Sequence, residues 1–194
     1  MDEKGLENRT RIKLDDCLFV VVDMQERLLP EIDRQAMVLS NAVRFLHFCR
    51  GSGLPIILVE QRKLGKTVPQ ITSLTEGKAA IPKDYFDAFA VRAFRDEIRR
   101  YERATLLVCG IETHICVAQT ALGGLNAGYR VHVVADATSS RHAENRAIGL
   151  DRLRLGGAVV TSTEMAIYEL LEAAGTDRFR RILPIVKAPD PTSL

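Results

Sequence analysis

Apolar runs rich in Val, Ile and Leu alternate with amphipathic stretches along most of this chain. Five runs have strand length: LFVVVD at 18–23, PIILVE at 55–60, ATLLVCG at 104–110, YRVHVVAD at 129–136 and GAVVT at 157–161. A run such as LFVVV, which has no polar interruption, suits a strand that is covered on both faces. The alternation predicts an α/β fold, in which βαβ units surround a mainly parallel sheet.

Amphipathic stretches predict the helices between these strands, at 34–50, 90–101, 114–127, 143–155 and 163–173. Residues 61–82 contain Gly, Pro and Thr without a clear period, so they predict a long loop with room for one short strand. No repeat or linker divides the chain. We therefore predict a single domain over 1–194, with a core at about 16–172 and, at 173–194, a tail that holds a short helix and a Pro-rich end.

Composition suits a globular protein and limits its partners. A chain of 194 residues buries about two-thirds of its unfolded surface on folding. Hydrophobic residues make up 46% and charged residues 27%, which argues against disorder. The net charge of +2, with Lys and Arg scattered among Asp and Glu, argues against a nucleic-acid-binding surface.

The N-terminal sequence and the cysteines bear on location. MDEKGLENRTRIKLDD is charged and has no apolar stretch of signal-peptide length, and the longest apolar runs are too short to span a membrane. We expect a cytoplasmic protein, or one of an organelle matrix, whose cysteines stay reduced. The cysteines, at Cys17, Cys49, Cys109 and Cys116, form no CxxC pair.

Three features follow predicted strands at the carboxyl edge, where open parallel sheets bind ligands. Asp23 ends the first strand, the loop from 61 follows the second, and the turn from Gly110 to Cys116 follows the third. Taken alone, the carboxylate of Asp23 suits a general base, a metal ligand or a helix cap equally. Lys83, in IPKDYFDAF, could place its ammonium in the cleft or extend it to solvent.

Cys116 has the most specific setting. The pattern of strand, turn and helix makes Thr113 the predicted N-cap and places Cys116 in the first helical turn. The unpaired N–H groups and the positive end of the helix dipole favour a thiolate there, and they can also hold an oxyanion. The alternative is a buried cysteine that packs as a small hydrophobe, which is the interpretation for the other three.

Three blocks carry a resemblance to a known family: FVVVDMQERLLP, IPKDYFDAF and VCGIETHICVAQTALGGLNAGYRVHVVADATSSR. In this order and spacing they resemble the isochorismatase-like, or cysteine, hydrolases, which include nicotinamidases, N-carbamoylsarcosine amidases and YcaC-type proteins. The resemblance covers about 16–172 and is greatest to a small YcaC-like branch.

The resemblance implies a three-layer α/β/α, flavodoxin-like fold and a catalytic triad of Asp23, Lys83 and Cys116. It also implies a non-proline cis peptide at Ile111–Glu112, with an oxyanion hole formed by the backbone N–H groups of Glu112 and Cys116. Homo-oligomers, dimers or larger, are implied as well. The Phe-bearing segment near 86–94 is a candidate interface.

Two differences between this sequence and the family's pattern reduce the range of reactions that we expect. Nicotinamidases carry a histidine-containing metal cluster after the second strand, but here that loop has no histidine, and His47, His114, His132 and His142 are dispersed. We expect no catalytic metal and no cofactor. Siderophore-type isochorismatases, which hydrolyse a vinyl ether, lack the cysteine, so Cys116 argues against that reaction. The segment at 62–65 is shorter than in the favoured branch, which leaves the substrate open.

Gln25, Gln61 and Thr113 are candidates to line the substrate pocket, although each could equally bond the backbone. Arg141, after the fourth strand, is interpreted as the partner of Asp136 or of a loop carboxylate.

The predicted function is hydrolysis of a small amide or related C–N bond through a cysteine thioester, with a small molecule as substrate and no nucleic acid or membrane as partner. The alternatives are a non-catalytic binding protein and a redox sensor that uses Cys116, with Cys109 as a resolving thiol if the fold brings it near. A flavodoxin-like electron carrier is disfavoured, because MQERLLP replaces a phosphate-binding loop after the first strand.

Overall fold

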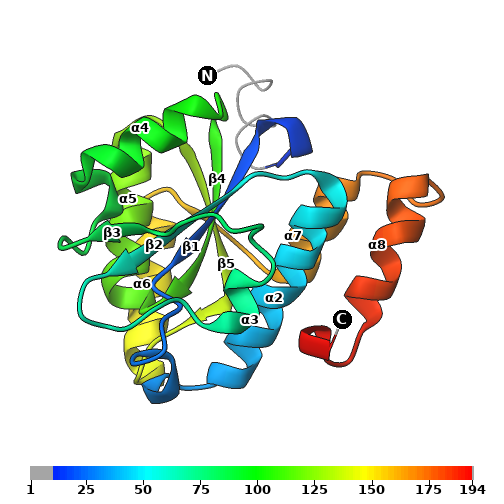
Figure 1. Ribbon diagram of the computed structural model, residues 1–194. Coiled ribbons are helices and arrows are strands. Elements are labelled where there is room, and N and C mark those ends of the chain that lie inside the picture. Colours follow the sequence, from blue (N-terminus) through cyan, green and yellow to red (C-terminus); the bar gives the residue numbers. More distant parts are fainter. Residues whose placement is uncertain (1–10, 194) are drawn as a thin grey trace.

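The computed structural model describes residues 11–193, which build one six-stranded sheet between two helical layers (Figure 1). The strands are β1 (Cys17–Val22), β2 (Ile56–Gln61), β3 (Ile81–Lys83), β4 (Thr105–Ile111), β5 (Arg130–Ser139) and β6 (Val159–Thr161). Their order is β3-β2-β1-β4-β5-β6, and every neighbouring pair is parallel. The predicted α/β fold with a mainly parallel sheet is confirmed.

The helices divide between the two faces of the sheet. One layer holds α2 (Gln35–Ser52) and α7 (Thr163–Leu171), with α8 (Asp177–Lys187) packed outside α2 (Figure 1). The other layer holds α4 (Arg92–Arg100), α5 (Ala118–Asn126) and α6 (Ala143–Leu155). The shorter elements are η1 (Leu14–Asp16), η2 (Leu29–Glu31), α3 (Pro69–Thr72), η3 (Ala88–Ala90), η4 (Thr113–Val117) and η5 (Pro191–Ser193).

Strand β1 shows why the apolar runs are unbroken. Successive side chains of a strand point to opposite faces. Cys17, Phe19 and Val21 pack against the α2 and α7 layer, while Leu18, Val20 and Val22 pack against the α4, α5 and α6 layer. All six are buried, so a polar residue at any of these positions would lose its water on folding.

Three segments differ from the sequence prediction. The segment 61–82, predicted as a loop with room for one short strand, contains the start of β3 and also the short helix α3, which was not predicted. Strand β5 runs past Asp136 to Ser139, because residues 138 and 139 pair with the end of β4 after an irregularity in register. The helix predicted at 114–127 begins with the π-helical turn η4 before α5. The C-terminal helix α8 contributes Ile182 to the core.

Glycine 110 sets how closely β4 approaches β1. It pairs with Val22 and has a φ of 118°. A Cβ atom built there would lie 1.9 Å from the carbonyl oxygen of Val22, so no other residue fits this backbone. The close approach brings the turn after β4 next to the residue that follows β1.

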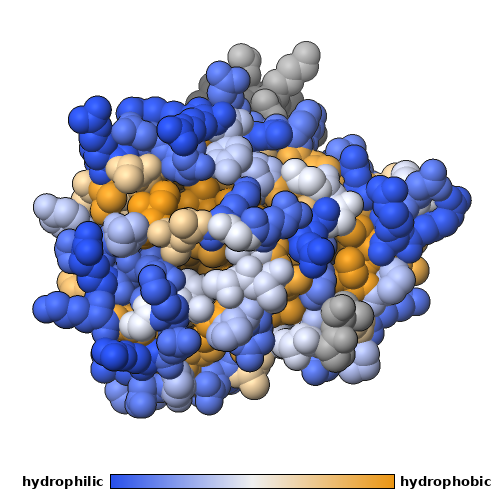
Figure 2. Space-filling model, in the orientation of Figure 1, coloured by the Kyte–Doolittle hydropathy of each residue, from blue (hydrophilic) through white to orange (hydrophobic). Residues whose placement is uncertain are grey.

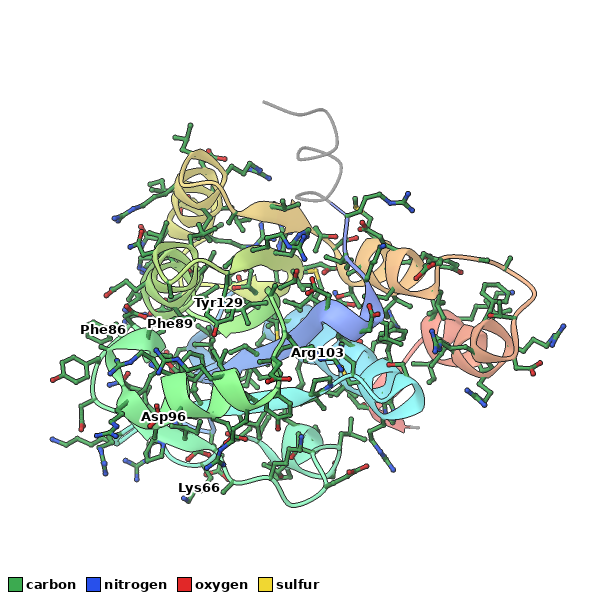
Figure 3. The ribbon with its side chains drawn as sticks, turned by 90° about the horizontal axis from the view of Figure 1, so that it is seen from above. Lys66, Phe86, Phe89, Asp96, Arg103 and Tyr129 are labelled. Atoms are coloured by element: carbon green, nitrogen blue, oxygen red, sulfur yellow. The ribbon has the colours of Figure 1, made fainter. Side chains whose placement is uncertain are left out.

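The Phe-bearing segment near 86–94, the candidate interface, is only partly exposed. Phe89 and Phe94 are buried and meet edge to face, with ring centroids 5.2 Å apart. Figure 3 shows Phe89 close to Tyr129 and Phe86 at the periphery. Tyr85 and Phe86 are the exposed aromatic residues of this segment, at 62% and 52% exposure.

A surface groove of about 540 Å³ lies between α4 and the edge of β2. The groove is lined by apolar residues, which include Ile56, Leu58 and Ile81, and by Lys78 and Tyr101. Figure 2 shows hydrophobic surface exposed on this side of the molecule. The groove does not include the residues predicted to be catalytic. Within residues 11–193, no helix is both long enough and apolar enough to cross a membrane.

Candidate active site

The structure brings Asp23, Lys83 and Cys116 together at the carboxyl edge of the sheet. Asp23 follows β1, Lys83 ends β3, and Cys116 lies in η4 after β4. The Lys83 Nζ atom donates to Asp23 Oδ2 at 2.7 Å, and both side chains are fully buried. Cys116 is 6% exposed, and its thiol interacts with both charged groups. A carboxylate, an ammonium and a sulfur therefore share one buried site.

Asp23 reaches this site because the chain turns sharply as it leaves β1. Its φ of 52° lies in the left-handed region, its N–H donates to Val59 O at 3.1 Å, and its carbonyl accepts from the Gln25 N–H at 2.8 Å. Oδ1 is buried and has no hydrogen-bond partner among residues 11–193. Lys83, the Cys116 thiol and the Gln61 main chain all interact with this carboxylate. Asp23 thus directs its side chain into the site shared with Lys83 and Cys116.

The Cys116 thiol is protonated at rest, since its burial outweighs the helix start, which alone favours a thiolate. Burial, followed by the charge of Asp23, raises the pKa of Cys116 to about 12, although Lys83 lowers it. Burial also raises the pKa of Asp23 above its ordinary value, against the effect of Lys83. The raised pKa makes the Asp23 carboxylate a stronger base here than in water.

The turn before Cys116 is shaped by Glu112. The Ile111–Glu112 peptide bond is cis, and the Glu112 carbonyl accepts from the N–H groups of Ile115 and Val117 at 3.1 Å each. Glu112, with an extended backbone, takes the N-cap position that was predicted for Thr113. The Thr113 hydroxyl instead bonds Thr138 Oγ1 at 2.9 Å, since the extension of β5 brings Thr138 beside it. The N-cap prediction is therefore wrong.

Two side-chain interactions hold this turn, and only the second was missed by sequence reasoning. The Glu112 carboxylate, 4% exposed, accepts from the Arg141 N–H at 2.8 Å and from Arg141 Nε at 3.2 Å. Arg141 was interpreted as the partner of Asp136 or of a loop carboxylate, and Glu112 is that loop carboxylate. The Asp136 carboxylate instead caps α7 through Thr163. His114 Nδ1 bonds Ser140 Oγ at 2.9 Å.

The three candidate pocket residues all have partners within the chain. Gln25 bonds the main chain at Gln61 and Gly65, and Thr113 bonds Thr138. The Gln61 side chain accepts from Lys83 Nζ at 2.8 Å. The structure thus places Gln25 and Gln61 around the ion pair.

The sheet separates Cys116 from the other cysteines. Cys17, Cys49 and Cys109 are buried in the α2 and α7 layer, whereas Cys116 packs in the layer of α5 and α6. All four are free thiols. Cys109 therefore does not serve as a resolving partner for Cys116 in this fold. In the described part of the chain, no three His, Cys, Asp or Glu side chains cluster as metal ligands do.

These buried thiols predict a loss of stability in alkali. Burial raises the pKa of Cys17 and Cys116 from 9.0 to about 12 and raises the pKa of Cys49 and Cys109 as well. A group whose pKa is higher in the folded state than in the unfolded state stabilises the folded state at every pH below its unfolded-state pKa. This contribution disappears as the pH rises toward the folded-state pKa. Above about pH 9 each such thiol should lower the free energy of unfolding by about 1.4 kcal/mol per pH unit.

Urea unfolding at pH 8, 9.5 and 10.5 measures this slope. A variant with Cys49→Ala and Cys109→Ala should show a shallower decline from its own value at pH 8. Equal slopes in the two proteins would show that these thiols do not cause the alkaline loss.

The chain matches a family model described as the isochorismatase domain over residues 17–165. A mouse relative, isochorismatase domain-containing protein 2A, is 36% identical over 186 residues, covering 94% of this chain and 88% of that protein. A structure described as MAR1 ribonuclease from Caenorhabditis elegans superposes with a TM-score of 0.84 and 28% identity, covering 94% and 95% of the two chains. The Escherichia coli YcaC product, described as an octameric hydrolase of unknown specificity, gives 0.85 and 22%, covering 90% of each chain. From the matched domain and the mouse relative together, we conclude that this chain belongs to the isochorismatase family of hydrolases.

Proposed function

We propose that this protein hydrolyses a C–N bond in a small amide or related molecule, with Cys116 as nucleophile. The observation that carries the proposal is the buried contact of 2.7 Å between Lys83 and Asp23, beside the Cys116 thiol. A buried ion pair beside a thiol can activate that thiol. The carboxylate takes the proton of the thiol, and the ammonium stabilises the negative charge that forms on the sulfur.

In the first half of the reaction, Asp23 takes the thiol proton while the sulfur attacks the substrate carbonyl. The ammonium of Lys83 stays charged and stabilises the sulfur as it loses the proton. The carbonyl becomes a tetrahedral oxyanion, and the C–N bond then breaks. The proton held by Asp23 passes to the nitrogen, so that ammonia or an amine leaves and an acyl thioester remains on Cys116.

In the second half, water hydrolyses the thioester. Asp23 removes a proton from the water as it attacks, the C–S bond breaks, and the sulfur recovers the proton from Asp23. The product is a carboxylic acid, and the site returns to its resting state. In both halves the backbone N–H groups of Glu112 and Cys116 are proposed to bind the oxyanion. Arg141 holds the Glu112 side chain through the carboxylate and so fixes the turn that carries this N–H.

The proposal predicts ammonia release from small amides. The full-length protein is incubated with a panel of primary amides and N-carbamoyl compounds, ammonia is measured, and the intact mass is recorded during turnover. We expect ammonia from at least one compound and an acyl adduct on the peptide that contains Cys116. RNA forms a second arm, because the nematode structure carries a ribonuclease name. RNA cleavage that persists in a Cys116→Ala variant, without amide hydrolysis, would overturn the proposal.

We also propose that the protein forms homo-oligomers. The exposed aromatic pair Tyr85 and Phe86 supports this, because exposed aromatic residues are enriched at interfaces. The YcaC protein of the same fold is described as an octamer.

A further inference from the structure

The polar residues behind the ion pair form a continuous set of hydrogen bonds, and we infer that Gln25 and Gln61 position Lys83 for the reaction rather than contact the substrate. The inference rests on the proposed function, because it assigns both residues to the same reaction.

Strand β2 continues beyond the point where β1 leaves the sheet. The last paired residues are Val22 and Val59, after which the chain turns out at Asp23 while β2 runs on to Gln61. β1 therefore offers the main chain of Gln61 no partner. The Gln25 side chain fills that place, since its Oε1 accepts from the Gln61 N–H and its Nε2 donates to the Gln61 carbonyl, each at 2.9 Å. A side-chain amide can do this because it carries the same groups as a peptide.

The Gln25 amide has no donor left for a ligand. Its second Nε2 proton goes to the carbonyl of Gly65 at 2.7 Å, and the residue is fully buried. Two further bonds join the same segments, from the N–H of Glu26 to Lys66 O and from the N–H of Arg27 to Leu64 O. Gln25 therefore holds the end of β2 and the following loop as one rigid unit.

Gln61 connects this rigid unit to Lys83 through a hydrogen bond. Its Oε1 accepts from Lys83 Nζ at 2.8 Å, and its Nε2 donates to the Asp84 carbonyl at 3.0 Å. With the bond to Asp23 Oδ2, two of the three ammonium protons have fixed acceptors. An ammonium held at two points cannot rotate, so the direction of its third proton is set. That proton remains for Cys116, whose thiol interacts with Lys83.

The neutrality of Gln61 matters as well as its shape. A glutamate at this position would keep the acceptor but add a carboxylate against the same ammonium. The positive charge that favours a thiolate at Cys116 would then be partly neutralised. A methionine would keep the length but lose the acceptor. The two substitutions thus separate the electrostatic role from simple packing.

The test measures alkylation of Cys116 by iodoacetamide in the folded full-length protein between pH 6 and 9.5, followed by mass spectrometry. We expect Gln61→Glu to react about tenfold more slowly at each pH, because a rise of about one unit in the pKa of the thiol reduces the thiolate tenfold. The matched control is Gln70→Glu, which adds the same charge at an exposed position and should react like the wild type. We expect Gln61→Met to lose only about threefold, because the charge near Lys83 is unchanged.

A wild-type alkylation profile for Gln61→Glu would overturn the inference, as would an equal loss in Gln61→Glu and Gln61→Met, since packing alone would explain it. A further variant, Gln25→Met, should speed hydrogen exchange at the Gln61 N–H, which loses its acceptor. Unchanged exchange there would refute the role given to Gln25.

Alkylation requires no turnover, so the two proposals fail separately. If Gln61→Glu slows alkylation but no amide is hydrolysed, the positioning of Lys83 stands and the proposed function falls. If amides are hydrolysed and Gln61→Glu alkylates like the wild type, only the positioning role falls.

Discussion

A Cys116→Ala variant is expected to lose amide hydrolysis by about a thousandfold or more and to form no covalent adduct. The sulfur is the only atom in the proposed reaction that bonds to the substrate carbon, so alanine leaves Asp23 and Lys83 without a nucleophile. The variant should stay folded, because Cys116 is buried among apolar side chains and alanine removes only one atom. Ammonia release and intact mass measure the two outcomes.

Cys109→Ala is the matched control. Cys109 is also fully buried but packs on the opposite face of the sheet, so its loss should leave both the adduct and the rate unchanged. If Cys116→Ala retained the activity of the wild type, the nucleophile would have to be another group. If Cys109→Ala were as inactive as Cys116→Ala, the effect would come from folding rather than from chemistry.

The second large effect concerns stability. Lys83→Met should lower the free energy of unfolding by about 3–5 kcal/mol at pH 7, because it leaves the Asp23 carboxylate buried without its cation. Removing both charges, in Asp23→Asn with Lys83→Met, should recover much of this loss. Urea unfolding with circular dichroism measures the difference. The control is Lys66→Met, since the Lys66 side chain is 85% exposed and its substitution should change stability by less than about 0.5 kcal/mol.

The Lys83→Met variant should also be less impaired at low pH. Burial already raises the pKa of Asp23 in the folded wild type, and loss of Lys83 raises it further. A carboxyl whose pKa is raised on folding stabilises the folded state at every pH below its pKa in the unfolded state. It loses that contribution as the pH rises. The difference from wild type should therefore be smaller at pH 4.5 than at pH 7. An equal difference at both would show that Asp23 does not carry the cost.

The strands and the three candidate residues Asp23, Lys83 and Cys116 could be predicted because each belongs to a recognisable local segment of the sequence. The unbroken run LFVVV indicates a strand buried on both faces, and its end places Asp23 at the carboxyl edge. The roles of Lys83 and Cys116 are ambiguous when each residue is taken alone, and the resemblance to the family assigned them to one site with Asp23. The structure places both beside Asp23.

The supporting contacts could not be predicted, because they join distant residues without a periodic pattern. Gln25 bonds the main chain 36 residues away, and Glu112 pairs with Arg141 over 29 residues. Neither spacing follows a helical or strand period. The raised pKa of the Cys116 thiol could not be predicted either, because a position at a helix start says nothing about the desolvation that causes it.

This arrangement supports a redox role for Cys116 less well than it supports a role as nucleophile. Oxidation begins from the thiolate, and a pKa of about 12 leaves very little of it at neutral pH. The sheet also keeps Cys109 away, so a sulfenic acid at Cys116 would lack that partner.

The contact between Gly110 and the Val22 carbonyl has a consequence for how this site can diverge. Here a main-chain oxygen occupies the place of a side chain, so the strands that lead to Asp23 and Cys116 lie this close only while position 110 is glycine. Any other residue at this position would push the strands apart and separate Asp23 from Cys116, whereas substitutions away from this contact leave it intact.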